Sequence, residues 1–181
     1  MSALVYVLIG VAVLLLAAIV YYFNRMIKLR NKVRRAWKDI DVQLKKRHDL
    51  IPLLVRVAEG YSLHERKVLV NVTEKRGQAQ AASGARDIGD KEWHLTMGLN
   101  DIFLLREEYP DLKADSAFQE LSDELVKVED HIAASRKYYN GSVRIYNTYI
   151  ESFPQMLFAR TFRFLTEEYF QIELDEKEYP T

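Results

Sequence analysis

The sequence predicts an all-α fold, in which an N-terminal transmembrane helix is followed by an antiparallel four-helix bundle with a long first and last helix. Three observations support this prediction. Residues 3–23 contain no charged side chain. Beyond them, apolar residues recur at three- and four-residue steps, which is the spacing of one helix face. Short stretches rich in glycine, proline, serine and aspartate separate these patterns, as expected for loops between helices.

The uncharged stretch is long enough to cross a bilayer. It has 21 residues, and a helix that rises about 1.5 Å per residue then spans a hydrocarbon core of roughly 30 Å. A secretory signal would carry positive charge before the apolar run and a small-residue cleavage site after it, and neither is present. We therefore expect a retained anchor that begins at Ala3 and ends with Tyr21, Tyr22 and Phe23 at headgroup depth.

A basic cluster follows the anchor. It consists of Arg25, Lys28, Arg30, Lys32, Arg34 and Arg35. By the positive-inside rule, we expect the N-terminus outside and the rest of the chain in the cytoplasm. Each cation would also gain about 1 kcal/mol against anionic lipid. The cluster is thus either a topology determinant or a lipid-binding surface, and its position at the bilayer favours lipid over nucleic acid as a partner.

The first bundle helix is expected to continue directly from the anchor. Its apolar face is marked by Val33, Trp37, Ile40, Leu44, Ile51, Leu54 and Ala58. Pro52 interrupts this pattern and should kink the helix or restart it near Asp49, because proline lacks a backbone N–H. Gly60 is the expected C-terminal stop.

Two shorter helices are expected in the middle of the chain. A capping box at Ser62–Glu65 should begin one that ends near Ser83. Residues 84–90 read as a loop, with Asp90 as the N-cap of the next helix. Tyr109–Pro110 should end that helix, because a residue before proline disfavours the helical conformation.

The last helix has the clearest pattern. A capping box at Ser116–Gln119 precedes apolar residues spaced as in coiled-coil packing, and Pro154 closes the helix. The formal net charge is zero, but residues 24–47 hold ten basic and two acidic side chains, whereas residues 101–181 hold nine basic and seventeen acidic ones. Antiparallel packing of the first and last helices would therefore place opposite charges side by side, each exposed pair contributing well under about 1 kcal/mol.

A catalytic or cofactor site is not indicated by any motif. The chain has no cysteine, and none of its four histidines follows a glutamate by three residues, the spacing that di-iron bundles use. His64–Glu65 begins like a zinc-protease helix, but Val68 occupies the second ligand position. We expect no enzyme activity, no metal and no cofactor. The run Glu129–Asp130–His131 is expected to be solvated surface, with a paired-ion site as the alternative.

An aromatic tail follows Pro154. Its candidate interaction residues are Phe158, Phe162, Phe164, Tyr169 and Phe170. The segment is too short and too rich in arginine to span a bilayer, yet too apolar to be left in water. It could pack back on the end of the bundle, lie at the membrane interface, or contact another subunit.

Two long motifs resemble the LemA family. The first runs from Ala36 through Trp37 and Asp39 to Pro52 and is followed by Gly60–Tyr61 and His64–Glu65. The second comprises residues 109–114, residues 136–140, Tyr146–Asn147 and Phe153–Pro154. The likeness covers about residues 1–173. One departure is residues 159–164, where the family usually has small residues with Gly-Phe.

The resemblance implies one N-terminal membrane span and a four-helix cytoplasmic bundle, with no catalytic activity or cofactor. Members of the family are bacterial membrane proteins of poorly defined function, some associated with membrane stress or remodelling. Some are encoded near membrane-bound zinc metalloproteases of the HtpX type, which makes such a protease a candidate partner.

The expected organisation is a short tail (1–2), the transmembrane helix (3–23), a basic juxtamembrane segment continuous with the first bundle helix (24–35), a LemA-like bundle (36–153) and the aromatic tail (154–181). The function expected first is a non-enzymatic, single-pass scaffold or adaptor that forms homo-oligomers and holds a membrane partner. The alternative is a module that binds or remodels anionic membrane surfaces.

Overall fold

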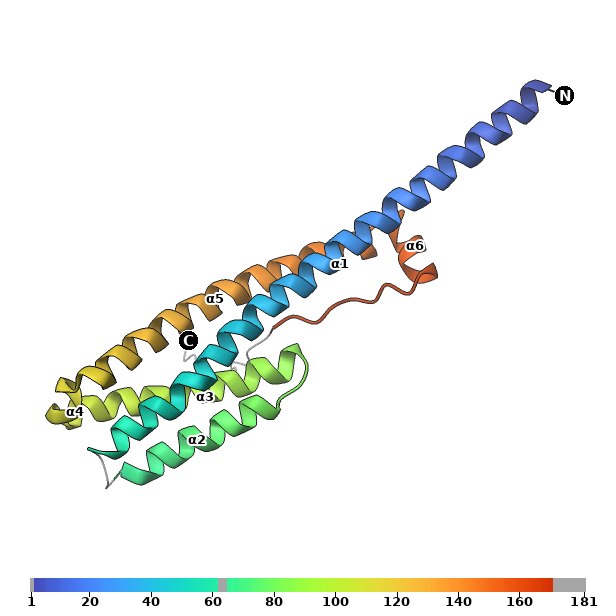
Figure 1. The fold of residues 1–181 in the computed structure, drawn as a ribbon. Helices are drawn as coiled ribbons and strands as arrows, with labels where there is room; N and C mark the ends of the chain where they lie inside the picture. The colour runs from blue at the N-terminus through green and yellow to red at the C-terminus, as the bar shows by residue number, and fades with distance from the viewer. Residues whose placement is uncertain (1, 62–64, 171–181) are drawn as a thin grey trace, which may run out of the picture. The chain divides into compact units, whose positions relative to one another are not determined.

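The computed structural model of the chain describes residues 2–61 and 65–170, and all of the regular structure in them is helical. The all-α prediction is therefore confirmed for this part of the chain. The helices are α1 (Ser2–Glu59), α2 (Arg66–Ala81), α3 (Ala85–Glu108), α4 (Pro110–Ala114), α5 (Ser116–Glu151) and α6 (Gln155–Thr161) (Figure 1).

The helices contribute to two compact units. Among the described residues, the first unit contains residues 2–37 together with Tyr138–Glu167, and the second contains residues 38–61, 65–137 and 168–170. Both α1 and α5 supply residues to each unit. The first unit therefore holds the N-terminal part of α1, the end of α5 and α6, while the second holds α2, α3 and α4.

Helix α1 passes through Pro52 without a break, so of the two expected outcomes, a kink or a restart near Asp49, the restart is excluded. Proline at this position cannot donate to the carbonyl four residues earlier, which belongs to His48. Nε of Arg76, on α2, donates to that carbonyl instead, at 2.6 Å. A side chain from a neighbouring helix thus satisfies the backbone group that Pro52 leaves unpaired. The helix ends at Glu59, immediately before Gly60, as predicted.

In the second unit, α2 and α3 lie side by side (Figure 1). The core of this unit consists of Ile51, Leu54, Val55, Ala58, Leu69, Val72, Ala79, Leu95, Leu99, Ile102, Leu105, Leu112, Phe118 and Leu125. Gly98 permits the close approach of the two helices, because a Cβ there would lie 3.1 Å from Cδ of Lys75 and 3.2 Å from a methyl group of Val72.

The loop between α2 and α3 is shorter than expected. Helix α3 begins at Ala85, so Asp90 lies inside the helix and the prediction that it is an N-cap is wrong. Gly84 has a φ of 85°, which lets the chain turn within three residues. The carboxylate of Asp87 accepts a hydrogen bond from the Ser83 amide at 3.0 Å. The Ser62 capping box lies outside the described residues, and α2 begins at Arg66.

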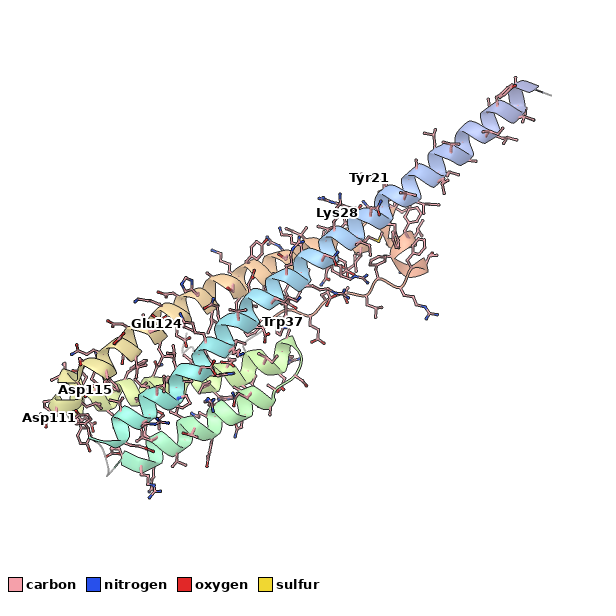
Figure 2. All side chains as sticks on the ribbon, in the orientation of Figure 1. Tyr21, Lys28, Trp37, Asp111, Asp115 and Glu124 are labelled. Atoms are coloured by element: carbon pink, nitrogen blue, oxygen red, sulfur yellow. The ribbon has the colours of Figure 1, made fainter. Side chains whose placement is uncertain are left out.

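Asp115, and not Ser116, caps α5. The amide of Phe118 donates to Oδ1 of Asp115 at 2.8 Å, whereas Ser116 is already the first helical residue. The hydroxyl of Tyr61 donates to the other carboxylate oxygen at 2.8 Å. These two donors lower the pKa of Asp115, the backbone amide having the larger effect. Figure 2 labels Asp115 at the start of α5.

Helix α3 ends at Glu108, before Tyr109–Pro110, as predicted, and the short α4 follows. Helix α5 is unbroken from Ser116 to Glu151 and continues through Gly141. The peptide bond between Phe153 and Pro154 is cis.

The first unit has its own core. It consists of Met26, Leu29, Val33, Ala36, Tyr139, Val143, Tyr146, Ile150, Ala159 and Phe164. The ring of Trp37, labelled on α1 in Figure 2, meets that of Tyr139 edge to face at 5.2 Å. After α6 the chain is tied to α5. The Tyr146 hydroxyl donates to the Leu165 carbonyl, and the side-chain amide of Asn147 makes two 2.9 Å hydrogen bonds with the backbone of Glu167.

The Asp115 cap can be tested by mutation. Asp115→Ala should lower the urea midpoint of the full chain in detergent, because the first-turn amide of Phe118 loses its acceptor. Ser116→Ala should leave the midpoint nearly unchanged. Circular dichroism measures both, and a larger effect at Ser116 than at Asp115 would contradict the assignment.

Candidate functional site

Among the described residues, one helix is long and apolar enough to cross a membrane, and it is α1. Its most apolar 18-residue window has a mean hydropathy of 3.0, and none of that window is buried. The side chains from Ala3 to Ala17 are exposed, as is Tyr21 (Figure 2). An exposed surface of this kind is unfavourable in water, but it matches the hydrocarbon core of a bilayer.

The aromatic end of the uncharged stretch is in contact with the tail of the first unit. Tyr22 stacks on Phe158, with the ring centroids 5.3 Å apart. Phe23 meets Phe162 at 5.1 Å and Phe164 at 5.7 Å, both edge to face. Figure 1 shows α6 beside α1. Three of the five predicted interaction residues therefore pack back on the anchor.

The other two tail residues belong to the second unit. Phe170 is buried, and the guanidinium of Arg136 lies 4.9 Å from its ring centroid. Tyr169 is exposed over slightly more than a third of its surface. The predicted tail set is thus divided between the two units, which its sequence spacing alone did not reveal.

The basic cluster is divided by its contacts. Arg25, Lys28, Arg34 and Arg35 are exposed, and Figure 2 labels Lys28 on α1. Arg30 and Lys32 are partly buried instead. The guanidinium of Arg30 lies 4.8 Å from the ring centroid of Phe164, and Nζ of Lys32 lies 5.3 Å from that of Tyr138. Cation–π contacts of this kind stabilise the unit by about 0.5–1 kcal/mol at exposed sites. Four of the six cations therefore face solvent.

A second site, which the sequence did not predict, is a buried ion cluster in the second unit. Arg47 on α1 is only 1% exposed. Its Nη1 donates to Oε2 of Glu92 at 2.8 Å, and its Nη2 donates to the Thr96 hydroxyl at 2.7 Å. The Nε atom forms an ion pair with Glu129 at 2.8 Å. His48 Nε2 lies 2.7 Å from the remaining oxygen of Glu92.

Burial sets the electrostatics of this cluster. It raises the pKa of Glu129, an effect that the nearby Arg47 opposes and Glu92 reinforces. Burial also lowers the pKa of Arg136, which the two carboxylates oppose. The paired-ion alternative therefore holds for Glu129, whose side chain is 33% exposed, whereas Asp130 and His131 are exposed, as expected for solvated surface. A signal was present in the sequence, because Arg47 stands on the apolar face between Leu44 and Ile51.

Within residues 2–61 and 65–170, no group of three or more histidine, aspartate or glutamate side chains is arranged to hold a metal ion. Histidine and glutamate do meet in the ion cluster. There, Glu92 is occupied by Arg47 on one oxygen and lies against His48 on the other.

A family model described as the LemA family matches residues 36–181. The chain belongs to the LemA family. The resemblance that the sequence motifs carried is thereby confirmed, and the match begins where the basic segment passes into the rest of α1.

Among individual proteins, this LemA-family chain is similar to magnetosome proteins. It is 22% identical over 182 residues to magnetosome proteins MamQ 1 and MamQ 2 of Paramagnetospirillum magneticum, covering 86% of this chain and 67% of theirs. It is 21% identical over 174 residues to magnetosome protein MamQ of Magnetospirillum gryphiswaldense, covering 82% and 64%. The LemA-family chain thus spans about two thirds of the length of these relatives.

The ion cluster predicts an asymmetric response to mutation in this LemA-family protein. Glu92→Gln should lower the free energy of unfolding by about 3–5 kcal/mol, because it leaves buried Arg47 with one carboxylate that is itself partly exposed. Urea unfolding of the full chain in detergent measures this loss.

Glu124→Gln is the matched control. It removes a carboxylate of α5 that pairs with Lys46, the residue before Arg47 on α1, but at the surface. Exposed pairs contribute little, so the control should unfold like the wild type. Similar stabilities for the two variants would show that the buried cluster is not a structural requirement.

Proposed function

We propose that the protein is a single-pass membrane protein that acts without catalysis, as an oligomeric scaffold or adaptor for a membrane partner. The observation that carries this proposal is the continuity of α1. One helix, Ser2–Glu59, contains both the exposed uncharged stretch and core residues of the second unit. A helix that is continuous in this way suits a protein that holds a partner at the bilayer.

The proposed body is the antiparallel four-helix bundle expected from the sequence. Contacts inside the second unit support it. Tyr61, which follows α1, bonds Asp115 at the start of α5, whereas Arg47, earlier in α1, pairs with Glu129, later in α5. Residue numbers therefore rise along α1 as they fall along α5, which is the relation expected for antiparallel helices.

The proposed orientation has the N-terminus outside and the rest of the chain in the cytoplasm, at the bacterial inner membrane. Its support is the exposed part of the basic cluster, Arg25, Lys28, Arg34 and Arg35, which follows the uncharged stretch. The same exposed cations favour a second function, the binding of anionic lipid at the membrane surface.

Self-association and partner binding would use side chains that the second unit leaves exposed. Large apolar residues there include Val42, Leu53, Leu104 and Val126. A membrane-bound zinc metalloprotease of the HtpX type is one partner to test. Cross-linking in intact membranes, followed by detergent extraction and mass measurement, should give more than one copy of the chain per particle. A monomer with no cross-linked protein would contradict the scaffold.

The anchor has a separate test. Full-length protein should stay in the membrane pellet after alkaline carbonate extraction, and residues 24–181 should be released, because the uncharged stretch supplies the insertion energy. A reporter fused after Thr181 should be active only in the cytoplasm. Release of the full-length chain would contradict the membrane span, and export of the reporter would contradict the orientation.

The truncated chain also separates the two functions. Binding of residues 24–181 to vesicles containing phosphatidylglycerol at low salt, but not to phosphatidylcholine vesicles, would support the lipid-binding function. If residues 24–181 bind neither kind of vesicle, the lipid-binding function is excluded and the scaffold function remains.

A further inference from the structure

The segment from Ser152 to Thr166, here called the foot, is packed against the end of the uncharged stretch. It includes α6, and its Phe158 and Phe162 contact Tyr22 and Phe23. The burial of α1 shows how far the covered surface extends. Residues 3–17 are exposed, whereas Ala18 and Ile19 are partly buried. At about 1.5 Å per residue, Ala18 lies roughly 7 Å inside the uncharged stretch from Phe23.

The foot also has the composition of a membrane-contacting surface. It contains no acidic residue. Its arginines, Arg160 and Arg163, are both exposed. Its exposed apolar side chains include Phe153, 77% exposed, and Leu157, 52% exposed. The foot therefore presents apolar and cationic groups together, which is the pairing found in segments that lie at a lipid interface.

We propose that the foot is a second contact with the bilayer that α1 spans, seated in its headgroup region. This inference rests on the proposed membrane span of residues 3–23. Apolar side chains such as Leu157 would enter the boundary between headgroups and acyl chains. The guanidinium groups of Arg160 and Arg163 would bind lipid phosphates.

Lipid is the favoured occupant because of where the foot is held. Stacking on Tyr22 fixes it beside the last residues of the span, at the depth where the headgroups begin. An exposed apolar side chain at that depth meets lipid in every direction that the protein itself does not cover. A protein partner would need a complementary surface at the same depth, whereas lipid surrounds the proposed span at that depth without any partner.

The foot is also joined to α5. The hydrogen bonds from Tyr146 to the Leu165 carbonyl and between Asn147 and the Glu167 backbone hold the chain that follows α6. A single spanning helix can tilt and rotate about its axis in the bilayer. A second contact, fixed to both α1 and α5, would restrict both motions, and so set the height and the rotation of the first unit at the membrane.

The lack of cysteine makes a direct test possible, because any single introduced cysteine is the only labelling site. A nitroxide label is attached to the full-length protein in liposomes at one introduced cysteine per variant: Leu157→Cys, Leu14→Cys or Ile145→Cys. All three positions are exposed, at 52%, 71% and 45%. Ile145 is the matched control, since it is an exposed apolar residue of the same unit but lies on α5. Its neighbour Tyr146 donates to the carbonyl of Leu165, the residue after Phe164, whose ring Arg30 covers, so Ile145 is expected at the level of the basic cluster.

Accessibility to oxygen and to a water-soluble nickel complex reports depth. The oxygen-to-nickel ratio should be highest at Leu14 and lowest at Ile145, the aqueous control. At Leu157 the ratio should be several-fold higher than at Ile145. A high ratio at Leu14 with equal ratios at Leu157 and Ile145 would contradict the proposed contact between the foot and the bilayer, but it would agree with the membrane span. A low ratio at Leu14 would overturn the span itself.

The role of the arginines has its own comparison. Adding phosphatidylglycerol to phosphatidylcholine liposomes should move the Leu157 label deeper. The double variant Arg160→Gln, Arg163→Gln should abolish that shift, whereas Arg144→Gln, an exposed arginine on α5, should retain it. An unchanged shift in the double variant would overturn phosphate binding by these two residues.

Discussion

The structure depends on unbroken backbone hydrogen bonding along α1, from the uncharged stretch to beyond Pro52. In the proposed membrane span, every peptide group must be bonded within the helix, because hydrocarbon offers no partner. At Pro52 one of these bonds is missing, and Arg76 of α2 supplies the donor that the His48 carbonyl would otherwise lack. The helix therefore reaches Glu59 without a break. Residues of α1 belong to the cores of both units. The same helix is the proposed connection between the bilayer and the second unit.

The buried ion cluster adds a second constraint. Burying Arg47 has a large desolvation cost, which is offset only when its guanidinium is surrounded by partners in good geometry. Glu92 and Thr96 of α3 supply hydrogen bonds, and Glu129 of α5 supplies an ion pair to Nε without a hydrogen bond. Apolar residues of the same volume often stabilise a protein as much as such a cluster or more. The cluster does require α1, α3 and α5 to meet in one register, since a shift of one residue would leave charges unpaired.

Much of the architecture could be predicted from local patterns. The uncharged stretch, the stop before Gly60 and the end of α3 before Tyr109–Pro110 follow from helix length and backbone chemistry. The misplaced features depended on three-dimensional contacts. Asp115 replaced Ser116 as the cap because a carboxylate accepts strongly and Tyr61 also reaches it. Pro52 did not restart the helix because a donor from α2 compensates for it.

The candidate sites show the same division. The anchor and the basic cluster were visible as runs of one residue type. The packing of Phe158 and Phe164 against α1 could not be predicted. These contacts join residues more than 130 positions apart in sequence, such as Tyr22 and Phe158. The ion cluster was indicated in the sequence by one charged residue, Arg47, on an apolar helix face. Its partners could be identified only once the helices were placed.

The continuity of α1 is tested most directly by hydrogen–deuterium exchange of the full chain in lipid. Amides from residue 20 to residue 37 should exchange as slowly as those from 40 to 50, because all of them are bonded within one helix. Rapid exchange confined to residues 24–35 would show a hinge after the uncharged stretch. It would contradict the continuity of α1, on which the proposed function rests.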